Sequence, residues 1–349
     1  MKAFQFVEWR KPGELREVPV PEPGPGQVLV KIGGAGACHS DLHILEMEKP
    51  QAGARSFKLP VTLGHENAGW VEKLGPGATG FAEGDPVIVY GPWGCGLCMN
   101  CRTGMENYCQ KPGGPTPGGL GLYDGGMAPY LLVPATRFLV PLGSLDPRDA
   151  APLSDAALTS YHAVKRSLHL LGPGSTAVVI GAGGLGQMAI QILKALSVAT
   201  TIVAVDAAAD KLEIAKRMGA DEGLLPGDTA VQRIKDMTRG YGAELVLDMV
   251  GVNATLQMAS QMGRVLGHLT IVGLGGGALP VSFASPPHEC SVASPFWGSI
   301  PELMEVVSLA QAGKIKMLVE HFPLDRAGEA YYLLHEGKIQ GRAVITPAA

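Results

Sequence analysis

The chain has 349 residues, 46% of them hydrophobic, and a formal net charge of −4 with a sequence pI of ≈ 6.1. This length and apolar content predict a globular protein of about two domains. Lysine and arginine are scattered rather than clustered, which argues against a nucleic-acid or acidic-membrane partner and favours a small, nearly neutral one. Glu8, Glu14 and Glu17 lie where an export signal needs an apolar core, so we expect a cytosolic protein.

The first predicted domain covers residues 1–155 and is mostly β. It is rich in glycine and proline, and short β-branched runs such as GQVLVKI (26–32) and DPVIVYG (85–91) lie between turn signals. The glycine-rich segment 113–126 predicts a loop. We therefore expect many short strands joined by long loops.

Two segments of this domain carry side chains that can hold a metal. Together, GACHSDLHI (36–44) and LGHENAGW (63–70) supply Cys38, His39, Ser40, Asp41, His43, His65 and Glu66. A thiolate and an imidazole are good zinc ligands, and a carboxylate could complete three protein ligands with the fourth position open. The sequence alone does not place the third ligand. Taken singly, each residue is also typical of a buried cysteine, a hydrogen-bonded histidine or a solvated acid.

Four of the six cysteines lie close together within residues 91–112, at Cys95, Cys98, Cys101 and Cys109. In a reducing compartment, clustered thiols bind metal more often than they form disulfides. Four thiolates at ~2.3 Å from one ion describe a closed structural zinc site, which leaves no position for a substrate. An iron–sulfur cluster is the alternative, but in the similar ferredoxin pattern the fourth cysteine follows after three residues and precedes a proline. The spacing favours structural zinc.

The second predicted domain covers residues 156–290 and is a doubly wound α/β domain with a parallel sheet. Helical patterns such as AADKLEIAKRMGA (208–220) alternate with strand-like runs at 176–183, 201–207, 244–251 and 268–275. The most apolar stretch, 176–193, contains four glycines and fits a strand, a turn and a helix better than a membrane span. Two helical stretches (299–315 and 326–338) and a strand-like run (341–347) follow in the tail.

A glycine motif follows the first strand of this second domain. Gly181, Gly183 and Gly186 form G-x-G-x-x-G before a helix, where they permit a tight turn, the approach of a pyrophosphate and close helix–strand packing. Asp206 follows at the end of the next strand, where a carboxylate can accept hydrogen bonds from an adenosine ribose. The motif alone is weak, because glycines also serve plain packing, but together with Asp206 it predicts dinucleotide binding.

In these residues the chain resembles the zinc-dependent alcohol dehydrogenases of the medium-chain dehydrogenase/reductase family. Within that family it is most similar to bacterial NAD-dependent secondary-alcohol dehydrogenases and aryl-aldehyde reductases. The resemblance covers nearly the whole chain and depends on Cys38 with Ser40 and His43, on GHE at 64–66, on the four-cysteine lobe and on GAGGLG with Asp206. It implies a GroES-like catalytic domain, a Rossmann domain and a tail, 291–349, that returns to the catalytic domain.

The resemblance also implies two zinc ions and one NAD per chain. Cys38, His65 and Asp155 would bind the catalytic zinc, with Asp41 and Glu66 beside them. Many relatives carry cysteine where this chain has Asp155, but the ligand charge is unchanged because a carboxylate replaces a thiolate. Glu66 is the rival third ligand, and Asp155 could instead cap the helix that follows it.

Further roles are implied by the same resemblance. Ser40 and His43 would pass the substrate proton to solvent by way of the cofactor ribose, while the zinc ion acts on the substrate oxygen. His39 stands where some relatives place an arginine for the pyrophosphate. The remaining expected contacts to the cofactor come from Gly184, Leu185, Thr159, Lys211 and Arg342.

Three aromatic residues, Trp93, Phe296 and Trp297, could line an apolar substrate pocket, although large aromatic residues are also typical of an ordinary core. The predicted function is reversible hydride transfer between NAD and an apolar or aryl alcohol, by a homo-oligomer with no nucleic-acid or membrane partner. A polyol or amino-alcohol dehydrogenase is the alternative. A metal hydrolase would have no use for the glycine turn, and a structural zinc protein would not need Cys38, Ser40, His43 and His65 together.

Overall fold

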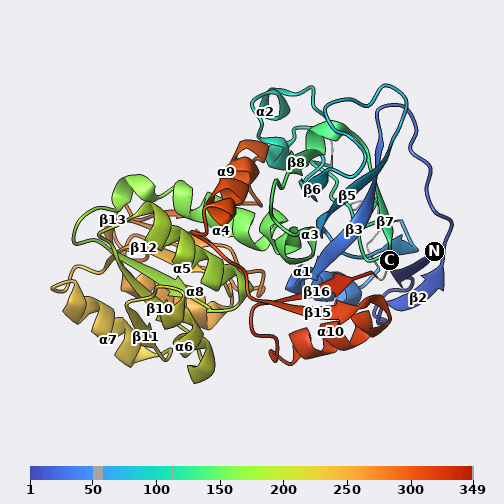
Figure 1. Ribbon diagram of the computed structural model, residues 1–349. Helices are drawn as coiled ribbons and strands as arrows, with labels where there is room; N and C mark the ends of the chain where they lie inside the picture. The colour runs from blue at the N-terminus through green and yellow to red at the C-terminus, as the bar shows by residue number, and fades with distance from the viewer. Residues whose placement is uncertain (50–57, 112, 348–349) are drawn as a thin grey trace. The chain divides into compact units, whose positions relative to one another are not determined.

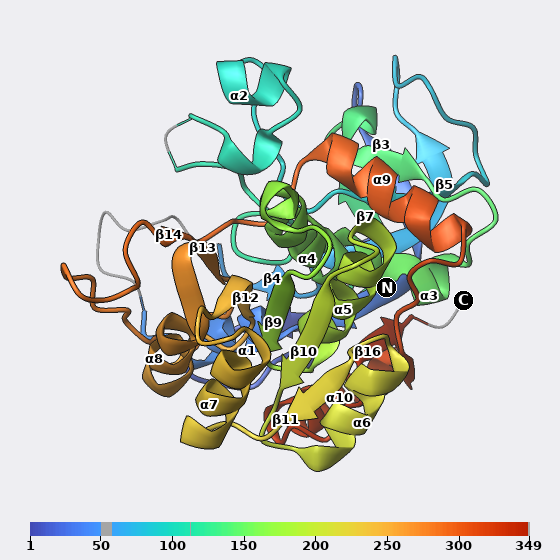
Figure 2. The ribbon, with the colours of Figure 1, turned by 90° about the vertical axis from the view of Figure 1, so that its left-hand side faces the viewer.

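The computed structural model describes residues 1–49, 58–111 and 113–347. The chain divides into two compact units, which Figure 1 shows in one view and Figure 2 in another. The first unit contains Met1–Leu158, Gly298–Gln311 and Met317–Ala349, and the second contains Thr159–Trp297 and Ala312–Lys316. From the sequence, we expect domain boundaries between residues 155 and 156 and between residues 290 and 291. Among the described residues, no helix has both the length and the apolar character of a membrane span.

A seven-stranded sheet forms the centre of the first unit. Along its path the strands are β15 (Val319–Pro323), β16 (Arg342–Thr346), β3 (Val28–Ala37), β5 (Glu66–Leu74), β6 (Pro86–Val89) and β8 (Leu139–Pro141), and β7 (Tyr130–Val133) also pairs with β3. A smaller sheet joins β2 (Glu14–Glu17), β1 (Lys2–Phe6) and β4 (Val61–Thr62). The glycine-rich segment 113–126 contains no helix or strand, as expected for a loop.

The long strand β3 organises this unit, because its residues are almost all buried and it pairs with three neighbours. Its start pairs with β7 and nearly its whole length with β5, while its last residues pair with the tail strand β16 in the register Ala343↔Ala37. The tail helix α10 (Ala327–His335) runs alongside β15 and β16, as Figure 1 shows. The part of the chain from β15 onward thus supplies two strands and a helix to the unit that the N-terminal residues begin.

The other described helices of the first unit range from one turn to three turns in length. They are α1 (His39–Glu46), α2 (Met99–Arg102), α3 (Pro147–Ala150) and α9 (Ile300–Gln311), with 3-10 turns at η1 (Glu106–Tyr108), η2 (Thr136–Phe138), η3 (Ala151–Ser154) and η5 (Leu324–Arg326). Helix α4 (Ala156–Lys165) begins at the end of this unit, and η4 (Leu168–Leu170) follows in the second unit.

The second unit is a six-stranded parallel sheet. Its order is β11 (Glu222–Leu224), β10 (Thr201–Val205), β9 (Thr176–Ile180), β12 (Ala243–Asp248), β13 (Gly263–Ile271) and β14 (Ser291–Ala293). Strand order reverses beside β9, the first strand, so the sheet is doubly wound. This arrangement confirms the predicted α/β class. Strand β14 begins at the predicted start of the tail but pairs with β13 of the parallel sheet. It has only three residues, which are too few for its sequence to predict a strand.

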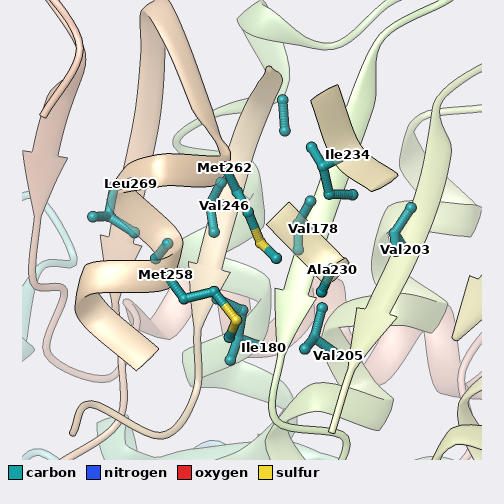
Figure 3. Close-up of a cluster of buried hydrophobic side chains, with 12 residues drawn as sticks. Val178, Ile180, Val203, Val205, Ala230, Ile234, Val246, Met258, Met262 and Leu269 are labelled. Carbon is teal, nitrogen blue, oxygen red and sulfur yellow. The ribbon is translucent and has the colours of Figure 1, made fainter. Parts of the chain in front are cut away.

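Helices cover both faces of this parallel sheet. Helix α5 (Gly184–Leu196) packs against β9 and β10, and α6 (Ala209–Arg217) packs against β10 and β11, while α7 (Asp228–Met237) and α8 (Asn253–Met262) pack together. Figure 3 shows the core under α7 and α8, where Ala230 and Ile234 of α7 and Met258 and Met262 of α8 meet Val178, Ile180, Val203, Val205, Val246 and Leu269 of the strands. These residues are at most 7% exposed, so the sheet that carries the glycine turn is a rigid platform.

Candidate active site and metal centres

The first candidate site is built where β3 ends and β5 begins. Cys38 follows β3 and is the N-cap residue of α1, while His65 and Glu66 lie at the start of β5. The antiparallel register pairs Gly36 with Glu66, so the two strands bring Cys38 and His65 side by side. A Cβ atom on Gly36 would lie 1.9 Å from Oε2 of Glu66, so only glycine leaves room for that carboxylate.

Four potential metal ligands meet at this point. The ligand atoms of Cys38, His65, Glu66 and Asp155 all lie within 4.8 Å of one another. Oδ2 of Asp155 is 3.8 Å from Sγ of Cys38 and 3.4 Å from Nε2 of His65. Cys38 and His65 are buried, and the side chain of Asp155 is 14% exposed. A thiolate, an imidazole and a carboxylate in a largely buried site match the ligands that zinc prefers.

Asp41 orients the imidazole ring. Its Oδ1 atom lies 2.9 Å from Nδ1 of His65, which leaves Nε2 directed at the other ligands. Burial alone lowers the pKa of His65, but the Asp41 charge and hydrogen bonds to Asp155, Asp41 and Cys38 outweigh it, so the pKa lies well above its usual range. A metal ion must displace that proton to bind Nε2.

The two carboxylates of this site have different partners. Nε of Arg342 donates to both carboxylate oxygens of Glu66, at 3.1 and 2.9 Å, and Nη2 also contacts Oε1. Burial raises the pKa of Glu66 to about 7, and Arg342 opposes that rise. Arg342 is 3.6 Å from Asp155 through Nη2. Glu66 is therefore engaged by a guanidinium group, whereas Asp155 faces the thiol and the imidazole.

The proposed relay residues lie on helix α1. Oγ of Ser40 is 3.3 Å from Nε2 of His65, and Ser40 is half-buried. His43 is exposed one turn later, and His39 is exposed at the start of the helix. The helix thus connects the buried ligand cluster to solvent through residues on neighbouring positions of its surface.

The second candidate site is the four-cysteine lobe around α2. The Sγ atoms of Cys95, Cys98, Cys101 and Cys109 lie within 4.8 Å of one another, and all are free thiols. The distance between the sulfurs of Cys98 and Cys101 is 3.4 Å, and between those of Cys95 and Cys101 it is 3.9 Å. Such separations suit four thiolates at ~2.3 Å around one tetrahedral ion.

Backbone amides point at these sulfurs. The amides of Leu97 and Cys98 donate to Sγ of Cys95 at 3.4 Å, and those of Gln110 and Lys111 donate to Cys98 and Cys109 at the same distance. The amide of Cys98, then that of Leu97, lowers the pKa of Cys95 to about 6, while burial raises the pKa of Cys101 to about 12. Amide donors stabilise thiolates, so the lobe fits a metal-bound cluster.

The glycine turn of the second unit fits a dinucleotide. Gly181 has φ +92°, which favours glycine, and a Cβ atom on Gly186 would lie 1.8 Å from the carbonyl oxygen of Gly181. A Cβ atom on Gly183 would meet nothing within 4 Å, so the space beside it is open. Gly184 and Leu185 begin α5, and their amides lie at the helix N-terminus, where phosphate groups bind.

Asp206 lies directly beside this turn. Its Oδ2 atom accepts a hydrogen bond from the amide of Ala182 at 2.7 Å, and Oδ1 accepts one from Ala208 at 2.9 Å. These bonds fix the carboxylate at the carboxyl end of the sheet, where ribose binds in doubly wound folds. Lys211 follows in α6, and Thr159 is buried in α4.

The three aromatic residues have defined environments within their own units. Trp93 is buried, donates its indole N–H to the carbonyl of Tyr90 at 2.8 Å and packs against Phe138. In the second unit, Trp297 is buried and Phe296 is 38% exposed, with their rings perpendicular and their centroids 5.4 Å apart. A substrate pocket lined by these residues stays a prediction.

The sequence analysis missed one residue of the first site, Tyr331. This tyrosine lies in α10, and its hydroxyl group donates to Oδ2 of Asp41 at 2.9 Å. The sequence around it shows only a helical pattern, and the contact joins residues 290 positions apart. No local signal could have identified it.

Comparisons with known proteins agree with this geometry. The model of the alcohol dehydrogenase GroES-like domain matches residues 24–144, and the zinc-binding dehydrogenase model matches residues 184–312. An NAD-dependent alcohol dehydrogenase of Sulfurisphaera tokodaii is 40% identical, covering 99% of this chain and 100% of its own length. A D-arabinose 1-dehydrogenase (NADP(+)) of Saccharolobus solfataricus is 36% identical, covering 99% of this chain and 97% of its own.

Comparison with a solved structure also indicates an alcohol dehydrogenase fold. The alcohol dehydrogenase of the hyperthermophilic archaeon Aeropyrum pernix superposes with a TM-score of 0.90 at 34% identity, covering 99% of this chain and 100% of that one. The family models, the relatives of matching length and the shared fold lead to one conclusion: the chain belongs to the zinc-dependent alcohol dehydrogenases of the medium-chain dehydrogenase/reductase family.

Proposed function

We propose that this protein is an NAD-dependent zinc alcohol dehydrogenase that interconverts an apolar or aryl alcohol with its aldehyde or ketone. The main observation behind the proposal is that the ligand atoms of Cys38, His65 and Asp155 lie close together in a largely buried site. Asp41 orients the ring of His65 there. Three protein ligands leave a fourth position open for the substrate, as catalytic zinc sites require. When bound, zinc would supply a Lewis acid for the substrate oxygen, and NAD would supply the hydride acceptor.

Asp155 is the third ligand in this proposal. Its Oδ2 atom faces Nε2 of His65 at 3.4 Å, whereas both oxygens of Glu66 accept hydrogen bonds from Arg342. The guanidinium group offsets the charge of Glu66, so the thiolate and Asp155 are left to balance a divalent ion. Arg342 remains a candidate for a pyrophosphate contact in addition to this role.

Ser40 and His43 move the substrate proton. The Ser40 hydroxyl group lies 3.3 Å from Nε2 of His65 and so stands at the ligand cluster, where it would hold the proton that leaves the alcohol. His43 is exposed on the same helix and would exchange a proton with solvent, for which an imidazole with an unperturbed pKa of ~6.5 is suited.

The preference for NAD follows from Asp206. The carboxylate lies beside the glycine turn, where it can accept hydrogen bonds from the ribose hydroxyls of NAD but would repel the 2′-phosphate of NADP. Ala207, Ala208 and Ala209 follow it and supply no cation to neutralise a phosphate. The names of two relatives specify different cofactors, so the support for NAD comes from these residues and from the Sulfurisphaera protein.

The substrate class is the least constrained part of the proposal. The exposed ring of Phe296 beside Trp297 favours an apolar or aryl alcohol. A polyol or sugar is the alternative, because one relative of similar identity is named as a sugar dehydrogenase.

The proposal includes a homo-oligomer in the cytosol. Strand β14 lies at the edge of the parallel sheet, and Val292 within it and Phe283 before it are 39% and 91% exposed. An open sheet edge with exposed apolar residues is suited to pairing with a second copy. A reducing location is supported by the six cysteines, which are all free thiols.

A panel of alcohols and ketones, assayed with NAD and NADP beside metal analysis, tests the function. We expect two zinc ions per chain and the highest kcat/KM for an aryl or apolar secondary alcohol with NAD. Asp155→Ala should lose one zinc together with activity, while Glu66→Gln, which keeps the size of the side chain, should retain both ions. Full zinc content and near-normal turnover in Asp155→Ala would transfer the ligand role to Glu66. A preference for sugars over apolar or aryl alcohols would show that the proposed substrate class is wrong.

A further inference from the structure

The hydroxyl group of Tyr331 reaches the carboxylate that orients His65. Its oxygen lies 2.9 Å from Oδ2 of Asp41, and Oδ1 of the same carboxylate lies 2.9 Å from Nδ1 of His65. Tyr331 is 4% exposed, and Asp41 and His65 are 0% and 1% exposed. The three residues thus form a buried chain of hydrogen bonds from α10 to a proposed zinc ligand.

The geometry around Asp41 shows what the tyrosine adds. Oδ2 also accepts a hydrogen bond from the amide of Cys38 at 3.0 Å, and that amide belongs to the same helix start as Asp41 itself. The Tyr331 hydroxyl group is the donor that comes from a distant element, 290 residues along the chain. It therefore ties the carboxylate to a second helix and restrains its rotation about the Cβ–Cγ bond.

The ring of Tyr331 has its own support, so its hydroxyl group can be removed alone. The ring stacks on Phe4, with centroids 5.8 Å apart and planes 20° apart, and the oxygen also contacts Sδ of Met127 at 3.3 Å. Burial raises the pKa of Tyr331 well above its usual range, so the hydroxyl group keeps its proton and donates it. A phenylalanine would fill the same space without the donor.

We propose that Tyr331 is a positioning residue for the catalytic zinc site, and that it acts through Asp41 to hold His65 in its ligand orientation. This inference rests on the proposed ligand set of Cys38, His65 and Asp155. Residues that orient a metal-bound histidine affect metal affinity by roughly ten- to a hundredfold. Tyr331 lies one hydrogen bond further out, so a smaller effect of roughly three- to tenfold is expected.

Release of zinc to a coloured chelator tests the proposal without measuring activity. The wild-type holoenzyme should release two ions in two phases, and Cys38→Ser should remove the faster phase, which assigns that phase to the proposed catalytic site. Tyr331→Phe should accelerate this phase at least threefold and leave the slower phase, from the cysteine lobe, unchanged. Tyr332→Phe is the matched control, because Tyr332 is the next residue and is 59% exposed. Both of its phases should match those of the wild type.

Two results would overturn the proposal. Acceleration of both phases alike would show that the hydroxyl group serves general stability, and acceleration of less than threefold would show that Asp41 holds His65 unaided. If the Cys38→Ser variant still released zinc in two phases, that result would instead contradict the proposed ligand set. Failure of the inference is thereby separated from failure of the proposed function.

A second background shows whether the effect passes through Asp41. In the Asp41→Ala background, adding Tyr331→Phe should change the rate of the faster phase by less than twofold, because the hydrogen bonds through Asp41 are already absent. A full threefold change in that background would overturn the proposed route. If Asp41→Ala does not fold, cobalt substituted for the faster-released ion supplies the measurement. Its visible bands should shift in Tyr331→Phe and stay unchanged in Tyr332→Phe, and unshifted bands in Tyr331→Phe would overturn the proposal.

Discussion

The two candidate metal sites of the first unit are built in opposite ways. The cysteine lobe takes its ligands from a stretch in which Cys95 and Cys109 are 14 residues apart, and local backbone amides point at the sulfurs. The other site joins Cys38 to Asp155 across 117 residues, and Tyr331 and Arg342 support it from further away. A locally made site depends on its metal for shape, whereas the second site is shaped by the sheet before any metal binds.

Matched cysteine substitutions should separate the two sites most strongly. Cys38→Ser removes a proposed ligand of the open site, so kcat should fall by about a thousandfold or more while the melting temperature stays within a few degrees. Cys98→Ser removes a proposed ligand of the closed lobe and should lower the melting temperature or the assembled fraction first. Calorimetry beside steady-state kinetics gives both readouts. Equal loss of stability in the two variants would contradict the contrast.

The residues on α1 sharpen the contrast by testing function alone. Ser40→Ala should reduce alcohol oxidation near neutral pH by a hundredfold or more, because the half-buried hydroxyl group is the first proton acceptor in the proposed relay. His43→Ala should lose roughly ten- to a hundredfold, and added buffer should restore part of that loss. The pH dependence of kcat with and without imidazole provides the measurement. Wild-type rates in Ser40→Ala would remove the proton relay.

Cofactor choice belongs to neither metal site, so it should be independent of zinc content. Because Asp206 would face the 2′-phosphate, kcat/KM with NAD should exceed that with NADP by about a hundredfold, which corresponds to ~2.7 kcal/mol. Asp206→Gly should shrink this ratio mainly by weakening NAD. The comparison uses initial rates with both cofactors at fixed alcohol concentration. Equal use of NADP by the wild type would show that Asp206 does not face the ribose.

Acid should weaken the open site in a defined direction. Because the pKa of His65 is raised in the metal-free site, the ring holds a proton near neutral pH, and zinc must displace it. Zinc affinity should therefore fall by at least about tenfold per unit as the pH drops from 8 to 6, as expected for one displaced proton. Competition with a chelator of known affinity at each pH measures this slope. A flat profile would show that zinc binding displaces no proton from the ligand set.

The contrast between the sites also explains what the sequence could predict. The cysteine spacing and the glycine turn are local, and the fold class followed from the alternation of strands and helices. The pairing of Glu66 with Arg342 spans 276 residues, so no local pattern indicates that this carboxylate is already engaged. The bond from Tyr331 to Asp41 is equally remote, and β14 is too short to signal itself. Each of these depends on tertiary packing alone.

The place of β16 in the sheet sets the order in which a growing chain can complete its parts. This strand lies between β15 and β3, and Arg342 is its first residue. The residues of the second unit therefore leave the ribosome before the first unit can close its sheet. Until then, Glu66 lacks its guanidinium partner and Asp41 lacks its tyrosine. The nascent protein should thus acquire its cysteine lobe early and its zinc-ready open site last, when synthesis is almost finished.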